Sequence, residues 1–323
     1  MGKANHEHAI LSLQYVPGKN IKNDAYTCVC AIFLVILQRI MTLKQQLYRV
    51  ETYLRHLFTS WNTGGEGIHS PYLFYLVRML IYDQNRYYCW SDIEQERRRL
   101  LRSRETIRVV DYGTGGNRQT DKPITEERRL QDIAATSLEQ AMVGQVLFRL
   151  VNYLGHVQQR PLRIVELGTS LGITTAYLAM ADRRNSVVTY EGSDALISQA
   201  KEVWKRLKIE NISTVQGNID ETLLRAPARD NIIGVGNEAP IDIAYLDANH
   251  TYEATMRYYT YLARYAQPHS IYILDDIHHS EQMARAWREI GQRGEVSTTM
   301  DFYHFGLVFF DPHYLKRHYT LRL

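Results

Sequence analysis

Three aspartates follow two apolar segments that have the composition of buried strands. Asp247 ends the segment "IDIAYLD", and Asp275 and Asp276 end the segment "SIYILDD". If these strands are neighbours in a parallel sheet, their carboxyl ends bring the three carboxylates towards one point. Adjacent carboxylates repel one another and resist burial unless a cation compensates their charge. Oxygen-only ligands suit Mg²⁺, so the sequence predicts a metal site formed by Asp247, Asp275 and Asp276.

The same region contains three candidates for a general base, namely Asp247, His250 and His278. A bound cation lowers the pKa of a coordinated hydroxyl, which makes its proton easier to remove. The residues alone leave open which of the three takes that proton. We interpret His279 and His304 as surface or packing residues. The alternative interpretation of the carboxylates is that they cap helices or face solvent at strand ends.

A glycine-containing turn follows another apolar segment, "LRIVEL", at residues 162–167. It has the spacing Glu166-x-Gly168-x-x-x-Gly172, with Thr169 and Ser170 between the glycines. Gly168 permits a sharp turn and a close approach of a cofactor to the backbone. The turn lacks the third glycine of a dinucleotide-binding loop and the lysine of a phosphate-binding loop. An acid followed by this glycine spacing is typical of enzymes that bind S-adenosylmethionine (SAM).

Two further segments end in polar residues that suit the same cofactor. The segment "SVVTYE" ends in Glu191, followed by Gly192 and Ser193. A carboxylate at this strand end can accept hydrogen bonds from both hydroxyls of a ribose. After the next segment, "ISTVQG", Asn218 can bond an adenine and Ile219 can pack on its face. We therefore predict a SAM site formed by these residues, the glycine turn and Asp247.

The quoted segments, together with "LDANHTYEAT" and "DDIHHSEQMARAW", resemble class I SAM-dependent methyltransferases. More narrowly, the chain resembles a bacterial group common in Bacteroidetes that also has "HSP", "DYGTGG"-like and "GLVFF"-like segments. The resemblance covers about residues 45–323. Metal-dependent O-methyltransferases of the catechol and antibiotic-sugar types carry aspartates at the positions matched by Asp247, Asp275 and Asp276. His250 stands where the catechol type has a lysine, which puts the general base in doubt.

The resemblance implies SAM-dependent O-methylation of a small hydroxylated molecule, with Mg²⁺ assistance. Two alternatives stay open at this point. An RNA-directed methyltransferase would use the arginine-rich segment "ERRRLLRSR", whereas a non-catalytic SAM-binding module would not need the carboxylate cluster. Neither nucleic acid nor a membrane is an expected partner, and a homodimer stays open. The sequence does not name the acceptor.

The elements that must position these residues alternate strictly from residue 161 onwards. Five strand–helix units are followed by "EVSTTMDF" and "FGLVFF", which must pair antiparallel because their link is short. "HYTLRL" is a candidate edge strand. Helices are expected at about 43–60, from Ser70, from Ser91 and over 138–154. We therefore predict an α/β fold with a Rossmann-like, mostly parallel seven-stranded class I methyltransferase sheet, preceded by an N-terminal helical lid.

Three domains follow from this pattern. Residues 1–40 are an extension, expected to be disordered or to precede a true start at Met41; 41–155 form the lid over the substrate, and 156–323 the SAM-binding catalytic domain. The uncharged run at 25–38 is shorter than the ~20 residues of a membrane span. The net charge is only +3, and the three cysteines form no disulfide or zinc pattern, which favours a cytoplasmic location.

A second glycine-rich turn, "VVDYGTGG" at 109–116, has the outline of the first but lacks a following helix. No strand ending in an acid follows at the right distance. We therefore do not expect a second cofactor loop. The simple interpretation is a flexible connector. The stronger hypothesis is that Asp111 to Gly116 lies over the substrate side of the SAM pocket.

Overall fold

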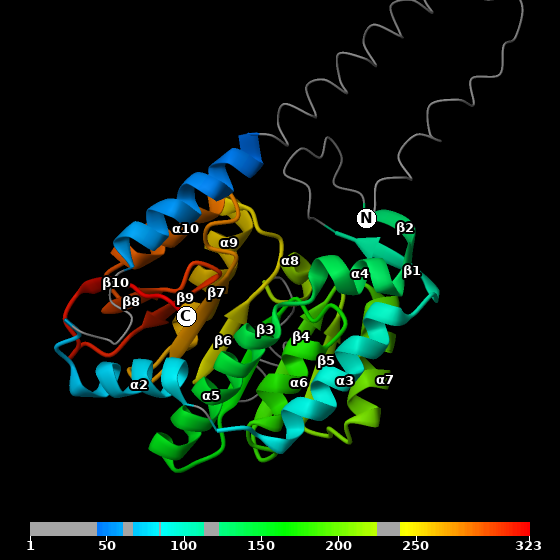
Figure 1. Ribbon diagram of the computed structural model, residues 1–323, viewed down its shortest axis with the longest axis horizontal. Helices are drawn as coiled ribbons and strands as arrows, with labels where there is room; N and C mark the ends of the chain where they lie inside the picture. Colours follow the sequence, from blue (N-terminus) through cyan, green and yellow to red (C-terminus); the bar gives the residue numbers. More distant parts are fainter. Residues whose placement is uncertain (1–43, 61–66, 84, 113–122, 225–239) are drawn as a thin grey trace, which may run out of the picture. The chain divides into compact units, whose positions relative to one another are not determined.

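The computed structural model describes residues 44–60, 67–83, 85–112, 123–224 and 240–323 (Figure 1). The chain divides into two compact units, Met1–Val50 and Glu51–Leu323. In the first unit the described residues, 44–50, are helical, and in the second unit residues 51–59 are helical. The predictions for 1–40 and for the apolar run at 25–38 fall outside the described residues. Among the helices that the described residues form, none is both long and apolar enough to cross a membrane.

An eight-stranded sheet with the order β10-β8-β9-β7-β6-β3-β4-β5 forms the centre of the second unit. All neighbouring pairs are parallel except those made by β9, which is antiparallel to both β7 and β8. The expected fold class is thereby confirmed, but the sheet has eight strands rather than seven, because the candidate edge strand also pairs as β10. The strands are β3 (Arg163–Leu167), β4 (Ser186–Glu191), β5 (Ile212–Gln216), β6 (Ile243–Leu246), β7 (Ile271–Asp275), β8 (Thr298–Asp301), β9 (Phe305–Phe309) and β10 (Arg317–Thr320).

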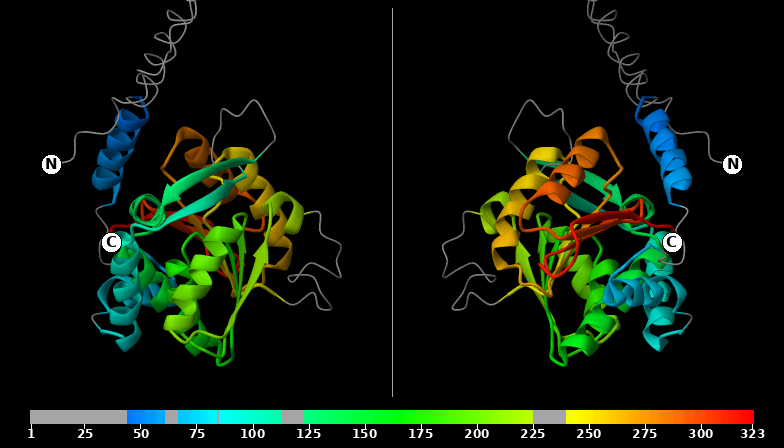
Figure 2. Two further views of the ribbon diagram at one scale, coloured as in Figure 1. Left: turned by 90° about the vertical axis from the view of Figure 1, so that its right-hand side faces the viewer. Right: turned by 90° about the vertical axis from the view of Figure 1, so that its left-hand side faces the viewer.

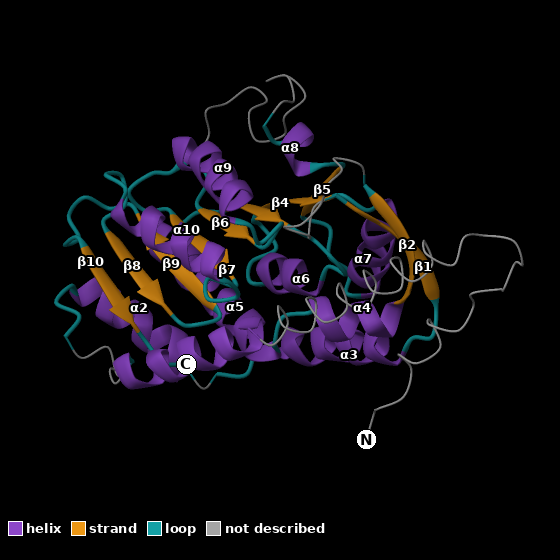
Figure 3. Cartoon of the chain, turned by 90° about the horizontal axis from the view of Figure 1, so that it is seen from above, coloured by secondary structure: helices purple, strands orange, loops and turns teal. Residues whose placement is uncertain are grey.

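Helices cover both faces of this sheet (Figure 3). Successive strand residues such as Ile164 and Val165 belong to opposite apolar clusters, because side chains alternate along a strand. One cluster includes buried residues of α5, α6 and α7, and the other those of α9 and α10. The central strands are therefore largely apolar, as parallel strands covered on both faces usually are. These helices are α5 (Ala141–Gln158), α6 (Ile173–Met180), α7 (Asp194–Arg206), α9 (Tyr252–Leu262) and α10 (Glu281–Gln292).

Shorter helices connect or extend these elements. The four-residue helix α8 (Ile219–Thr222) follows β5, and a 3₁₀ turn, η1 (Ala263–Tyr265), extends α9. Before the sheet, α2 (Pro71–Tyr82) packs on α5, and α3 (Tyr88–Arg102) packs on α6 and α4 (Leu130–Ser137). Ser70 caps α2 as expected, because its hydroxyl accepts a hydrogen bond from the backbone N–H of Leu73. Helix α3 begins before Ser91, so the expectation of a start at Ser91 is wrong.

The region before residue 155 also contains a β-hairpin that we did not predict. Strands β1 (Thr106–Asp111) and β2 (Ile124–Arg129) pair antiparallel in a separate two-stranded sheet. Figure 2 shows this hairpin lying across one end of the large sheet. Every residue of β2 is exposed, so its sequence, "ITEERR", lacks the alternation of apolar and polar residues that marks a half-buried strand.

Candidate functional site

One cavity of about 450 Å³ lies at the carboxyl ends of the parallel strands. Its other side is lined by residues of the β1–β2 hairpin and of the α4 region, including Tyr112, Arg128 and Ser137. Its size is within the range of small-ligand sites. Ten of the residues predicted from the sequence line it, namely Gly168, Ser170, Glu191, Gly192, Asn218, Ile219, Asp247, His250, Asp275 and Asp276.

The first glycine of the turn after β3 sits where only glycine fits. Gly168 has φ +98°, and a Cβ there would overlap the backbone carbonyl oxygen of Asp247. The turn therefore runs directly against the end of β6 and leaves bare backbone facing the cavity.

The second glycine, Gly172, allows two helices to pack closely together. Gly172 has φ +74°, and a Cβ there would lie 2.7 Å from Ala200 and from the Trp204 indole nitrogen. That nitrogen donates a 2.8 Å hydrogen bond to the Gly172 carbonyl oxygen. Gly172 therefore sets the close approach of α6 to α7 rather than contacting the cavity.

Glu166 lies beneath the turn and is fully buried. Its Oε2 accepts hydrogen bonds of 2.6 Å from the hydroxyls of Thr175 and Thr189. The hydroxyls of Thr189 and the buried Thr169 are 2.5 Å apart. Burial raises the pKa of Glu166 to about 7, although the two threonine hydroxyls act in the opposite direction. In this arrangement Glu166 and Thr169 support the turn from behind.

Glu191 is held at the end of β4 by backbone donors. Its Oε2 accepts from the N–H of Ser170 and its Oε1 from the N–H of Ser193, both at 2.9 Å. Burial raises the pKa of Glu191, and these N–H groups partly counteract the increase. Each oxygen keeps a free lone pair after one such bond, so a carboxylate at the cavity wall can still accept ligand hydroxyls.

The second glycine-rich segment reaches the same cavity beside Glu191. A Cβ on Gly192 would lie 2.6 Å from the ring of Tyr112, and Ser193 Oγ accepts a 3.3 Å hydrogen bond from the N–H of Val110. Asp111 and Tyr112 thus line the cavity that also contains Asp247. The remainder of the predicted covering turn, residues 113–116, lies outside the described residues.

Asn218 and Ile219 occupy the end of β5. Asn218 caps α8, with its Oδ1 accepting a 3.0 Å hydrogen bond from the N–H of Asp220. Its side-chain NH₂ is left to donate elsewhere. Both residues line the cavity, as the proposed adenine contacts require.

The predicted aspartates meet at the ends of β6 and β7, and a fourth carboxylate joins them. Burial and then the charge of Glu139 raise the pKa of Asp247. Burial and then the charge of Asp247 raise the pKa of Asp275. Burial and then the charge of Asp276 likewise raise the pKa of Glu139. Glu139 comes from the link between α4 and α5, and nothing in its sequence context marks it.

The histidines of this region lie in two different places, some in the cavity and one outside it. His250 lies in the cavity, with Nε2 3.4 Å from Asp247 Oδ1, and burial lowers its pKa. His279, interpreted from the sequence as a surface or packing residue, also lines the cavity, with Nδ1 3.3 Å from Asp276 Oδ2. His278 instead approaches Asp301, at 2.7 Å. The structure therefore brings Asp247 and His250 together, but not His278.

Comparison with known proteins supports the methyltransferase assignment of this domain. Residues 165–277 match the family model described as a methyltransferase domain. No curated protein matches the chain. The matched range contains the glycine turn, Glu191 and all three predicted aspartates.

Three solved structures illustrate the similarity of fold. Cofactor-bound Rv0187 from MTB is 21% identical, covers 55% of this chain and 83% of its own, and has a TM-score of 0.45. The Bacillus cereus O-methyltransferase in complex with SAH is 20% identical, with coverage of 56% and 88% and a TM-score of 0.46. TomG from Streptomyces achromogenes, an O-methyltransferase of tomaymycin synthesis in complex with SAM, is 18% identical, with coverage of 70% and 91% and a TM-score of 0.47.

Proposed function

We propose that this chain is a SAM-dependent methyltransferase that transfers the methyl group to a hydroxyl of a small molecule. The proposal rests on the observation that one cavity has two halves of different chemistry. Gly168, Glu191 and Asn218 form one half, and the carboxylates around Asp247 form the other. A cofactor in the first half would present its methyl group to an acceptor in the second.

The first half fits SAM. At Gly168 and Gly192 a Cβ would collide with neighbouring atoms, so the backbone stays bare beside the cavity. Glu191, fixed by two backbone N–H groups, can accept the ribose hydroxyls, and Asn218 and Ile219 can contact the adenine. When bound, SAM supplies an electrophilic methyl group to a nucleophile held in line with it. The residues of the chain contribute alignment, which accounts for much of the rate in such a transfer.

The second half fits a hard cation such as Mg²⁺. Its donors are carboxylate oxygens, which this ion prefers. Asp275 Oδ1 is buried and accepts no hydrogen bond from the described residues. Asp247, Asp275 and Asp276 would hold the ion, which would acidify a coordinated hydroxyl. His250, whose pKa burial lowers, is uncharged near neutral pH and can accept the acceptor's proton beside Asp247.

The arginine-rich helix offers no comparable support for an RNA substrate. Arg97 donates to Glu94 and to the backbone carbonyl of Glu139, and Arg99 donates to Glu96. These pairs engage two of the five arginines of the segment, so Arg97 and Arg99 are less available to phosphates. We therefore retain a small molecule as the proposed acceptor.

Calorimetry with SAM tests the cofactor half. We expect the wild-type chain to bind SAM and Glu191→Gln to bind it about thirtyfold more weakly, since charged hydrogen bonds contribute ~1.5–3 kcal/mol. Glu210→Gln, which changes an exposed glutamate, is the matched control. Absence of SAM binding by the wild type would refute the proposal.

Activity assays test the catalytic half. A panel of hydroxylated metabolites with methyl-labelled SAM identifies the acceptor. Asp247→Asn should then lower the rate of transfer by at least a hundredfold. If Mg²⁺ neither binds to the wild type nor changes its rate, the metal part of the proposal fails and the SAM part stands.

A further inference from the structure

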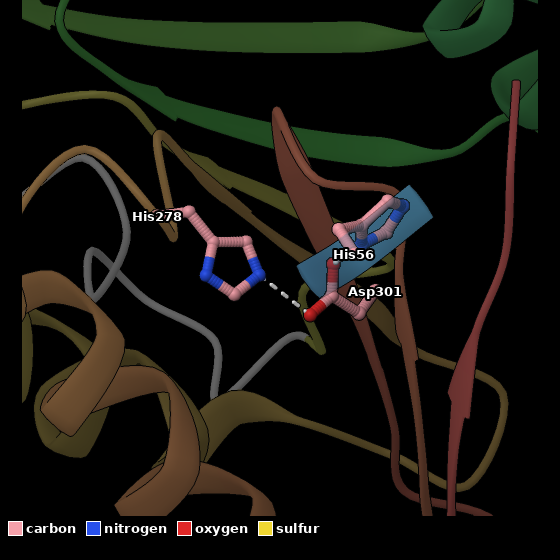
Figure 4. A group of neighbouring side chains, drawn as sticks. All are labelled: His56, His278 and Asp301. Carbon is pink, nitrogen blue, oxygen red and sulfur yellow. Dashed lines mark hydrogen bonds and ion pairs between the residues drawn. The ribbon is translucent and has the colours of Figure 1, made fainter. Parts of the chain in front are cut away.

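A second group of potential metal ligands lies outside the cavity. His56 of the helical segment 51–59, His278 of the loop after β7 and Asp301 at the end of β8 point towards one another (Figure 4). One ligand atom from each residue lies within 4.8 Å of the other two. The side chains of His56 and Asp301 are only 5% and 6% exposed, and that of His278 is 20% exposed. Three distant segments of the chain thus place two imidazoles and a carboxylate together in the protein interior.

The hydrogen bonds of His56 leave one ring nitrogen suited to a cation. Its Nε2 lies 3.1 Å from the backbone carbonyl oxygen of Leu321, which can only accept, so Nε2 carries the hydrogen. In the neutral ring Nδ1 then has a lone pair, and it faces Asp301 Oδ1 at 3.4 Å. Two lone pairs facing each other repel unless a proton or a metal ion lies between them. Donation from the other ring nitrogen to a carbonyl is the usual support for a metal-binding histidine.

The ligand atoms are close enough together to bind a single small ion. Ligands about 2.0–2.1 Å from Zn²⁺ are separated by about 3.3 Å at the tetrahedral angle. The distance from His56 Nδ1 to Asp301 Oδ1 is 3.4 Å, and that from His278 Nε2 to Asp301 Oδ2 is 2.7 Å. These two contacts end on different oxygens of the carboxylate, so binding one ion would require His278, which lies in a loop on the more exposed side, to move. The N–H of Tyr303 donates to Asp301 Oδ1 at 2.8 Å and fixes the carboxylate.

The ligand types favour a transition-metal ion over a hard cation such as Mg²⁺ at this site. Imidazole nitrogens favour Zn²⁺ and its transition-metal neighbours, whereas Mg²⁺ prefers oxygen. This site therefore differs in its proposed ligands from the three aspartates proposed to hold Mg²⁺ in the cavity. Three protein ligands leave a fourth position for water on the side of His278.

We infer that His56, His278 and Asp301 form a transition-metal site, with Zn²⁺ as the expected ion. The ion anchors the helical segment 51–59 to β8 and to the loop that carries Asp276 into the cavity. Binding of the ion would position this loop, and the inference does not depend on the proposed methyl transfer.

Cobalt titration of the full chain tests the inference. After treatment with a chelator, Co²⁺ alone is added and its visible ligand-field absorption is recorded. We expect one Co²⁺ per chain, displacement by Zn²⁺ and a higher Tm in Zn²⁺. His56→Gln and Asp301→Asn should each weaken binding about a hundredfold or more, beyond the loss typical of supporting residues. His313→Ala removes a histidine that is 89% exposed and should bind like the wild type.

A variant of the cavity separates this site from the carboxylate cluster. Asp247→Asn should leave the cobalt spectrum unchanged. The inference is overturned if no ligand-field band forms, if His56→Gln binds as the wild type does, or if Asp247→Asn alone abolishes binding. Far-ultraviolet circular dichroism verifies that each variant is folded. If Asp301→Asn does not fold, His56→Gln decides the result.

Discussion

The buried carboxyl of Glu166 should make the stability of the protein depend on pH in an identifiable way. Burial raises its pKa from 4.5 to about 7. A group whose folded pKa is raised binds more protons in the folded state, so stability falls as pH rises between the two values. At 1.36 kcal/mol per pKa unit, the displacement corresponds to about 3 kcal/mol. This contribution is fully present below about pH 4.5 and lost above about pH 7.

Glu166→Gln isolates this contribution. Glutamine keeps a carbonyl oxygen that accepts from Thr175 and Thr189, but it does not titrate. The free energy of unfolding of wild type and variant should be measured by urea denaturation at several pH values from about 4.5 to 8. The difference between them should shift by about 3 kcal/mol in favour of the variant as pH rises. Other titrating groups contribute equally to both proteins and cancel.

Parallel pH profiles for the two proteins would falsify the reasoning about Glu166. Glu210→Gln provides the matched control, because this glutamate is exposed and its profile should follow that of the wild type. A shift of the same size in the control would point to a general effect of charge rather than to burial.

Three further predictions concern the stability of the folded protein. Gly168→Ala should destabilise the protein by about 2–4 kcal/mol in urea denaturation, through left-handed strain and overlap, whereas Gly294→Ala, with open space around it, should change stability by less than about 0.5 kcal/mol. Arg160→Met should lower the free energy of unfolding by about 2 kcal/mol, because it leaves the buried Asp242 without its bidentate partner. The 40% exposure of the Arg160 side chain limits the loss. An unchanged urea midpoint would contradict this prediction. Asp275→Asn should raise the urea midpoint of the cation-free protein at pH 8, since burial raises the pKa of this carboxyl, and should abolish the increase in Tm caused by Mg²⁺ in thermal melts.

Local chemistry made much of the sheet and the cofactor turn predictable. The segments that form β3, β4, β6 and β7 are largely apolar, because both faces of each strand are covered, and helical patterns separate them. In a parallel sheet the carboxyl ends of such strands share one edge. The sequence positions of Gly168, Glu191 and Asp247 were therefore enough to place them around one cavity.

The hairpin, Glu139 and the position of His278 depended on tertiary structure. Strand β2 is exposed and gives no periodic signal, so its pairing is set by contacts around β1 and α4. Glu139 joins the carboxylates only because the chain before α5 passes over the ends of β6 and β7.

His278 shows most clearly the difference between what sequence spacing predicts and what the fold determines. From the sequence it was a candidate base, two residues after Asp276. In the fold its ring meets Asp301, and His56 approaches the same carboxylate from a segment more than two hundred residues away. Sequence spacing determines which strand end a residue follows, whereas the direction of its side chain depends on the turn and on what packs against it. The sequence alone therefore predicted most of the residues that line the proposed cofactor site, and only the folded chain brought together the second group of proposed metal ligands.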